Sequence, residues 1–139
     1  MAQQVRDIMT ADPVVVTPHA SVIDVAQRMR TEDIGSVLVV EDGALRGLVT
    51  DRDLVVRILA EGGAVTDRPV SEACSEELLT VTPDDDVRQA LSLVRGRAVR
   101  RLPVVENERP VGIISLGDLA VERDPGSALS DISAAAPNT

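Results

Sequence analysis

The sequence predicts an α+β fold built from two copies of one β-α-β-β-α unit. Three observations support this prediction. A shift of 65 positions, which carries Val16 onto Val81, superposes one half of the chain on the other. In each half, an apolar stripe with helical spacing precedes two aliphatic stretches that are separated by a turn. A period of this length is too long for a solenoid repeat, so we expect two half-domains packed on each other.

Two phrases show the repeat most clearly. GLVTDRDL occupies Gly47–Leu54, and GIISLGDL occupies Gly112–Leu119. The same shift superposes VTP at Val16–Pro18 on VTP at Val81–Pro83, and it also places VVE on VVE. A chance match would not keep its register across the whole unit, so we infer an internal duplication.

The first copy begins with an extended piece, PVVVTP at Pro13–Pro18. Ser21 is the expected N-cap of the helix that follows. The apolar positions of this helix are Val22, Val25, Ala26 and Met29. The stretches SVLVVE and RGLVT are the expected strands, and the Asp-Gly of the intervening DGAL favours a tight hairpin. A second helix is expected to open at Thr50.

The second copy repeats this order from ELLTVTP at Glu77–Pro83. Asp86 is the expected N-cap. The apolar stripe consists of Val87, Ala90, Leu91 and Val94. RLPVVE and VGIIS are the expected strands on either side of ENERP, and the second helix opens at Ser115.

The repeat sets the expected domain boundaries. Residues 5–62 form the first repeat, 63–69 a linker and 70–124 the second repeat. Residues 125–139 are small, polar and aperiodic, and we expect them to form a flexible tail.

The composition excludes several classes of function. Aromatic residues make up 0% of the chain, so it lacks the stacking platforms of RNA-binding modules, and a ligand base would have to lie between aliphatic side chains. The formal net charge of -9 argues against nucleic acid and anionic membranes as partners. The single cysteine, Cys74, allows no intrachain disulfide and no cysteine-based zinc site. With no signal-peptide pattern and no run of roughly 20 apolar residues, we expect a soluble cytoplasmic protein.

The pattern Ser/Thr-x-x-Asp at Thr50–Asp53 and Ser115–Asp118 has two compatible interpretations. It is a variant of the capping box, in which the hydroxyl caps a helix and the acid reaches back to the backbone. The same carboxylate can also point into a cleft and accept hydrogen bonds from two vicinal hydroxyls, as on a ribose. Gly47 and Gly112, which precede the motif, would let a ligand approach the strand.

These phrases, together with VRDIMT at the start and VRRLPVV in the second copy, resemble a tandem pair of cystathionine β-synthase (CBS) domains, of the small stand-alone bacterial kind associated with hypoxic or stress responses. The resemblance covers residues 5–124. It implies a module with a pseudo-two-fold axis and two clefts between the repeats, which bind AMP, ADP, ATP or S-adenosylmethionine. It implies a regulatory role and no required cofactor.

The resemblance also implies roles for individual residues. Asp53 and Asp118 would hold ribose hydroxyls, with Thr50 and Ser115 near the phosphate or ribose. The adenine would lie among aliphatic side chains at the start of each repeat. In this sequence the matching positions are Val14 and Leu79, and the positions that match the family's phosphate-binding residues are Arg100 and Arg101.

The two copies differ at the arginines. The positions matching Arg100 and Arg101 in the first repeat are Gly35 and Ser36. In related modules, a cleft takes its ribose aspartate from one repeat and its phosphate residues from the other. This pattern pairs Thr50 and Asp53 with the two arginines and predicts one cleft suited to a phosphorylated nucleoside and one weak or empty cleft. The competing interpretation makes the arginines a solvated pair on a strand edge.

Two functions therefore compete. One is a nucleotide-sensing module whose ligand changes the packing or assembly of the repeats and signals to a protein partner. The other is a ligand-free stress-response scaffold or dimerisation module. We expect no enzyme, because no nucleophile–base set or phosphate-cradling loop is present, and no metal site. In either case the apolar helix Leu54–Leu59 predicts a homodimer.

Four side chains outside the motifs receive structural interpretations. His19 is expected to be exposed at a helix entrance. Cys74, which aligns with Met9 of the other copy, is expected to pack as a small apolar residue, with a reactive thiol as the alternative. Arg52 and Arg57 could reach a phosphate or pair with nearby acids, and we favour pairing at the surface.

Overall fold

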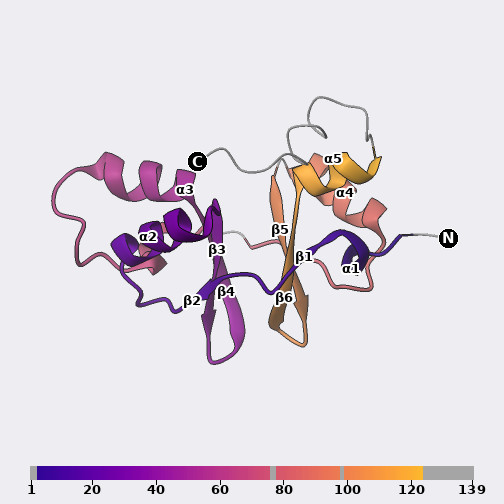
Figure 1. Cartoon of the computed structure of the whole chain (residues 1–139), viewed down its shortest axis with the longest axis horizontal. Coiled ribbons are helices and arrows are strands. Elements are labelled where there is room, and N and C mark those ends of the chain that lie inside the picture. Colours follow the sequence, from indigo (N-terminus) through magenta and orange to yellow (C-terminus); the bar gives the residue numbers. More distant parts are fainter. Residues whose placement is uncertain (1–2, 76–77, 98, 124–139) are drawn as a thin grey trace. The chain divides into compact units, whose positions relative to one another are not determined.

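The helices and strands of the first repeat follow the predicted order in the computed structural model, which describes residues 3–75, 78–97 and 99–123 (Figure 1). The elements are β2 (Val15–Val16), α2 (Val22–Glu32), β3 (Ser36–Glu41), β4 (Ala44–Thr50), α3 (Asp51–Asp53), η1 (Leu54–Ile58) and η2 (Leu59–Glu61). After one α-helical turn, the helix that begins behind Thr50 widens into the π-helical turn η1, where the carbonyls of Leu54 and Val55 share the Leu59 N–H. Such wide turns are rare and disturb the regular spacing of a helix.

The second repeat has the same order of elements. They are α4 (Val87–Arg97), β5 (Arg101–Glu106), β6 (Arg109–Ser115) and α5 (Leu116–Arg123). Each repeat starts with short elements: α1 (Val5–Ile8) and β1 (Thr10–Ala11) in the first, and the 3₁₀ turn η3 (Val70–Ala73) in the second. The tail predicted for residues 125–139 lies outside the described residues.

The extended pieces that open each repeat are shorter than predicted. In the first repeat only Val15 and Val16 form a strand, which pairs in parallel with β3. In the second, Val81 alone makes a parallel bridge, to Val104. Each piece thus extends a hairpin by a few hydrogen bonds.

Both helices that follow are capped as predicted. The Ser21 hydroxyl oxygen accepts a hydrogen bond from the Asp24 N–H at 3.1 Å. The Asp86 carboxylate accepts one from the Arg88 N–H at 2.8 Å. These side chains satisfy N–H groups that would otherwise lack an intrahelical partner.

Two-residue turns close both hairpins. Asp42 and Gly43 join β3 to β4 with φ angles of 54° and 79°, which confirms the predicted Asp-Gly turn. In the second repeat the same turn is made by Asn107 and Glu108, with φ angles of 53° and 67°. Strand β6 consequently begins at Arg109, earlier than the predicted VGIIS strand. Neither residue of the second turn is glycine, so the turn carries steric strain that glycine would avoid.

Each compact unit combines segments from both sides of a repeat boundary. One unit joins the chain up to Asp12 with the chain from Leu79 onward, and the other spans Pro13–Leu78. Strand β1 pairs antiparallel with β6, so the first unit contains a sheet of order β1-β6-β5 (Figure 1). The second unit contains the sheet β2-β3-β4. The compact units therefore do not coincide with the sequence repeats.

Hydrogen bonds hold the N-terminal segment to the second repeat. The Val5 N–H donates to the Asp85 carbonyl at 2.8 Å, and the Val87 N–H donates to the Gln3 carbonyl at 2.9 Å. In the other unit, the Val70 N–H of η3 donates to the Ala20 carbonyl at 2.7 Å. Val5 and Val70 are repeat counterparts, and both side chains are fully buried. The first residues of each repeat thus complete the core of the other repeat.

Each unit has its own aliphatic core. In the unit with the N-terminal segment, the buried residues are Val5, Val81, Val87, Ala90, Val94, Leu102, Val104, Ile114 and Leu119. In the other unit they are Val22, Val25, Met29, Val37, Val39, Val49, Ile58, Val70 and Ala73. The predicted stripes of α2 and α4 supply much of both cores, as expected for amphipathic helices.

Candidate functional site

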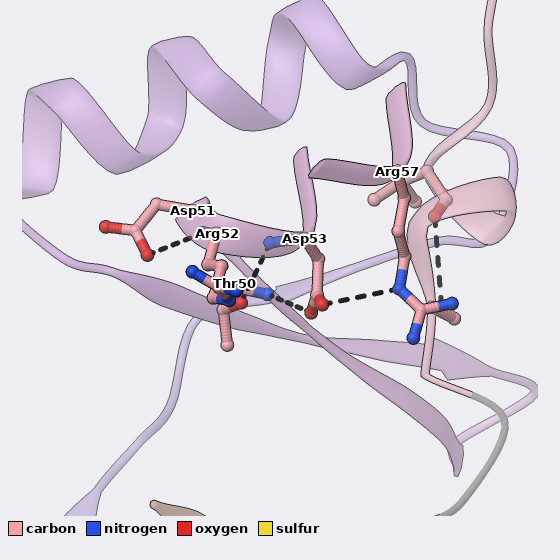
Figure 2. Close-up of polar contacts among 7 residues, drawn as sticks. Thr50, Asp51, Arg52, Asp53 and Arg57 are labelled. Atoms are coloured by element: carbon pink, nitrogen blue, oxygen red, sulfur yellow. Dashed lines mark hydrogen bonds and ion pairs between the residues drawn. The ribbon is translucent and has the colours of Figure 1, made fainter. Parts of the chain in front are cut away.

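The first Ser/Thr-x-x-Asp motif forms a complete capping box at the junction of β4 and α3 (Figure 2). The Asp53 N–H donates to Thr50 Oγ1 at 3.1 Å, and Asp53 Oδ2 accepts from the Thr50 N–H at 2.9 Å. The two bonds fix the carboxylate against the end of the strand. The capping interpretation of this motif is therefore confirmed.

The second motif has the same geometry at the junction of β6 and α5. The Asp118 N–H donates to Ser115 Oγ at 3.1 Å, and Asp118 Oδ2 accepts from the Ser115 N–H at 2.9 Å. Asp53 and Asp118 are both partly buried. The duplication thus places two carboxylates in equivalent positions, each with a second oxygen that the capping box does not use.

The glycines before the motifs have a different role from the predicted one. A Cβ atom on Gly47 would lie 2.9 Å from the sulfur of Cys74, and one on Gly112 would lie 2.6 Å from the sulfur of Met9. The space above each glycine is therefore filled by the segment that completes the repeat, and the expectation that it admits a ligand is wrong. Cys74 packs against the core of its unit, as predicted.

Arg100 and Arg101 lie beside the motif of their own repeat. Arg101 is the first residue of β5 and pairs in register with Ser115, and the Arg100 carbonyl accepts a hydrogen bond from the Leu116 N–H at 2.7 Å. The Arg100 side chain is exposed and that of Arg101 is partly buried. The matching positions in the other unit are equivalent, with Ser36 opposite Thr50. The pairing of the arginines with Thr50 and Asp53 stays a prediction.

The two predicted adenine neighbours are partly buried aliphatic residues in different units. Val14 packs against the core of the unit that contains Thr50, and its carbonyl accepts a hydrogen bond from the Leu38 N–H at 3.0 Å. Leu79 packs against the core of the other unit. Their role in binding stays a prediction.

Arg57 occupies the remaining oxygen of Asp53. Its Nε atom lies 3.5 Å from Asp53 Oδ1, in an ion pair between positions i and i+4 (Figure 2). The surface pairing predicted for Arg57 is confirmed, although its partner was not identified. The four-residue spacing of the two side chains in a helix was the signal that identifies this partner.

The charges of Asp53 and Arg57 also act on the thiol of Cys74. Burial raises the pKa of Cys74, the negative charge of Asp53 raises it further, and the positive charge of Arg57 lowers it. The Cys74 sulfur lies 3.8 Å from the Val70 carbonyl oxygen. The pKa of Cys74, the only cysteine of the chain, therefore depends on the charges of Asp53 and Arg57.

An apolar groove opens on the unit that contains the first motif. It has a volume of about 300 Å³ and is lined by Val22, Ile23, Ala26, Met29, Asp51, Leu54, Val55, Ile58, Leu59 and Val65. Val55, Val56 and Leu59 of the helix behind Thr50 are more than half exposed. The predicted apolar helix face is therefore present at the surface of this unit.

His19, Asp84 and Asp85 lie outside the two motifs. His19 is exposed, as predicted. Asp84 pairs with Arg6, and Asp85 accepts a hydrogen bond from the Thr82 N–H. Within residues 3–75, 78–97 and 99–123, no three His, Cys, Asp or Glu side chains gather closely enough to hold a metal ion. No helix in these same ranges is long and apolar enough to cross a membrane.

The chain is a tandem-repeat module. It contains two copies of a β-α-β-β-α unit, and each copy has the aspartate of a capping box at the start of its last helix. A family model described as the CBS domain matches residues 5–60 and 70–123. The chain therefore belongs to the CBS domain family, and it carries two CBS repeats.

Several known proteins are similar over most of the chain. The CBS domain-containing protein YhcV of Bacillus subtilis is 39% identical over 133 residues, which cover 93% of this chain and 94% of that protein. Hypoxic response protein 1 of Mycobacterium tuberculosis is 34% identical over 116 residues, or 83% and 81% of the two chains. The crystal structure of CBSX2 in complex with AMP matches with a TM-score of 0.72 and 26% identity, covering 86% of this chain and 94% of that one.

Proposed function

We propose that this chain is a regulatory module that binds an adenosine compound between its two repeats without turning it over. The observation that carries the proposal is the pair of aspartates, Asp53 and Asp118, that occupy equivalent capping boxes in the two repeats. In Asp53 and Asp118 the capping box orients the carboxylate and uses one hydrogen-bond site of one oxygen. A carboxylate has about four lone-pair sites, so further sites are left for ribose hydroxyls.

Family membership supports an adenosine ligand. CBSX2, which shares the fold and 26% of its residues with this chain, was solved in complex with AMP. The candidates here are AMP, ADP, ATP and S-adenosylmethionine. Because the chain has no aromatic residue, the adenine would lie among aliphatic side chains, and Val14 and Leu79 are the proposed neighbours.

Charge favours one of the two sites. The chain has a net charge of -9, so an anionic ligand needs a local cluster of cations. We assign the phosphate to Arg100 and Arg101, at the site where Asp53 of the other repeat holds the ribose and Thr50 lies near the phosphate or ribose. The second site would combine Asp118 with uncharged counterparts of the arginines, and it would bind a phosphorylated ligand weakly or not at all.

Regulation then follows from differential affinity. A ligand shifts a conformational equilibrium only by the difference in its affinity for the two states. A nucleotide held by residues of both repeats would favour the arrangement in which both sets of contacts form. A protein partner would then bind one arrangement of the repeats more tightly than the other.

Calorimetric titration with AMP, ADP, ATP and S-adenosylmethionine tests this proposal. We expect saturable binding of at least one compound, weakened at least tenfold by Asp53→Asn. Asparagine can still accept the Thr50 N–H bond but lacks the charge that strengthens hydrogen bonds to the ribose, which is worth about 1.5–3 kcal/mol. Asp118→Asn is the matched control and should weaken binding less. The absence of heat with all four compounds would contradict the proposal and favour the scaffold.

The exposed apolar helix favours a second role in assembly. Leu59 is 62% exposed, and it lines the groove together with Val55, while the nearby Val56 is also more than half exposed. In the second repeat the counterparts of Ile23 and Leu59 are Arg88 and Asp124, so the sequence puts charges at these positions. We propose that a second copy of the chain covers the apolar face in a homodimer.

Leu59→Glu is expected to weaken this dimer by more than tenfold, because it places a charge in an apolar contact. Sedimentation at micromolar concentration measures the change. Val15→Glu, at an exposed valine that does not line the groove, is the matched control and should leave the dimer intact. A wild-type chain that sediments as a monomer would refute the proposed dimer.

A further inference from the structure

Asp53 and Asp118, the aspartates of the two capping boxes, differ in one contact. Asp53 Oδ2 is held by the capping box and Oδ1 by Arg57, so both oxygens already have a partner in the chain (Figure 2). The repeat counterpart of Arg57 is Glu122, so the sequence places an acid four residues after Asp118. The arginine is therefore specific to the first repeat.

The ion pair between Arg57 and Asp53 is weak enough for a ligand to displace the arginine. The separation of Nε and Oδ1 is 3.5 Å, and the Arg57 side chain is 44% exposed, whereas that of Asp53 is 17% exposed. Exposed pairs between positions i and i+4 change an equilibrium by only about twofold. The carboxylate is held in place by the backbone, while the guanidinium is held weakly and faces solvent.

A guanidinium is suited to a second anion. It carries five N–H donors in a planar fork that matches a phosphate as well as a carboxylate. A ribose hydroxyl that takes Asp53 Oδ1 would displace Arg57 by a short distance. The released cation would then lie next to the ligand, where a phosphate can bind it and a neutral nucleoside cannot.

We propose that Arg57 is a specificity-determining residue of the first-repeat site, which transfers its guanidinium from Asp53 to an anionic group of the bound nucleotide. A phosphorylated ligand replaces the lost ion pair, whereas an uncharged nucleoside must break it without compensation. The site thereby selects phosphorylated adenosine compounds. This inference rests on the proposed function, because it concerns the same carboxylate.

The test compares AMP with adenosine in calorimetric titrations of the wild type and Arg57→Gln. We expect the substitution to weaken AMP binding about tenfold, since charge-assisted hydrogen bonds to the phosphate are lost. Adenosine binding should stay constant or tighten by up to about twofold, since no ion pair has to be broken. Arg57→Lys should retain part of the preference for AMP, because it keeps the charge but loses the planar fork.

Arg28→Gln is the matched control. It removes the same charge from the same unit and breaks another pair between positions i and i+4, in which Arg28 Nε lies 3.3 Å from Glu32 Oε2. We expect no change in the ratio of the two dissociation constants. If Arg57→Gln weakened AMP and adenosine equally, or neither, the inference would be wrong and the proposed function would stand. If the wild type bound neither AMP nor adenosine, the inference would be wrong, and only silence with ADP, ATP and S-adenosylmethionine as well would also overturn the proposed function.

Cys74 supplies a readout that needs no ligand. Arg57 lowers the pKa of this thiol, while Asp53 and burial raise it. Arg57→Gln should therefore raise the pKa further and shift the pH dependence of iodoacetamide alkylation towards higher pH. Arg28→Gln should leave it unchanged. An unshifted profile in Arg57→Gln would show that the guanidinium does not lie beside Asp53, and it would overturn the inference.

Discussion

Val5→Ala is expected to destabilise the second repeat by about 1.5–3 kcal/mol, although Val5 belongs to the first repeat in the sequence. The Val5 side chain is fully buried in the core formed by α4, β5 and β6. Truncation removes two buried carbon groups and leaves a cavity. Val70→Ala should have the mirror effect, because Val70 is fully buried in the core of the first repeat.

Hydrogen exchange of backbone amides resolves the two effects. Val5→Ala should lower the protection of β5 and β6 and leave β3 and β4 protected as in the wild type. Val70→Ala should do the reverse, because the units have separate cores and local opening depends on local packing. Equal loss of protection in both hairpins with either variant would contradict this assignment of the segments.

Gly112→Ala is expected to cost about 1–3 kcal/mol in the free energy of unfolding. The new methyl group would lie 2.6 Å from the Met9 sulfur and 2.9 Å from the Thr10 carbonyl oxygen. The methionine side chain can move, but the carbonyl belongs to the backbone of β1, which pairs with β6 at this point. Relief of the clash therefore requires the two strands to separate.

Three further variants test the cause of this effect in denaturant unfolding. Gly47→Ala meets only the side chain of Cys74, so a simultaneous Cys74→Ala should restore most of the stability. Met9→Ala should restore less in Gly112→Ala, since the backbone oxygen remains. Gly96→Ala, within α4 and without an atom in reach of the new methyl group, should stabilise by about 0.4–1 kcal/mol. If Gly112→Ala unfolded like the wild type, the close approach of the two strands would be wrong.

Local signals account for what could be predicted. The caps at Ser21 and Asp86 and the Asp-Gly turn at Asp42 depend on residues within a few positions of one another. The capping boxes at Thr50 and Ser115 are local in the same sense. Such contacts form wherever the chain is helical or turned, so a pattern in the sequence is sufficient to identify them.

Contacts between distant segments could not be predicted from the pattern. Gly47 and Gly112 were assigned to ligand approach because the sequence does not show that Cys74 and Met9 fill the space above them. The opening strand was expected over Pro13–Pro18, but only Val15 and Val16 form a strand with β3. In both cases the outcome depends on which segment packs there.

The amino-acid sequence by itself determined the duplication, the order of helices and strands in each copy, and the pair of aspartates that cap equivalent helices. These features follow from the spacing of residues along the chain, and that spacing is fully visible in the sequence. Only the tertiary structure decided that the first residues of each repeat complete the core of the other, and that Arg57 occupies the free oxygen of Asp53. Packing and ion pairing depend on distances in space, and residues with the same spacing can meet different neighbours.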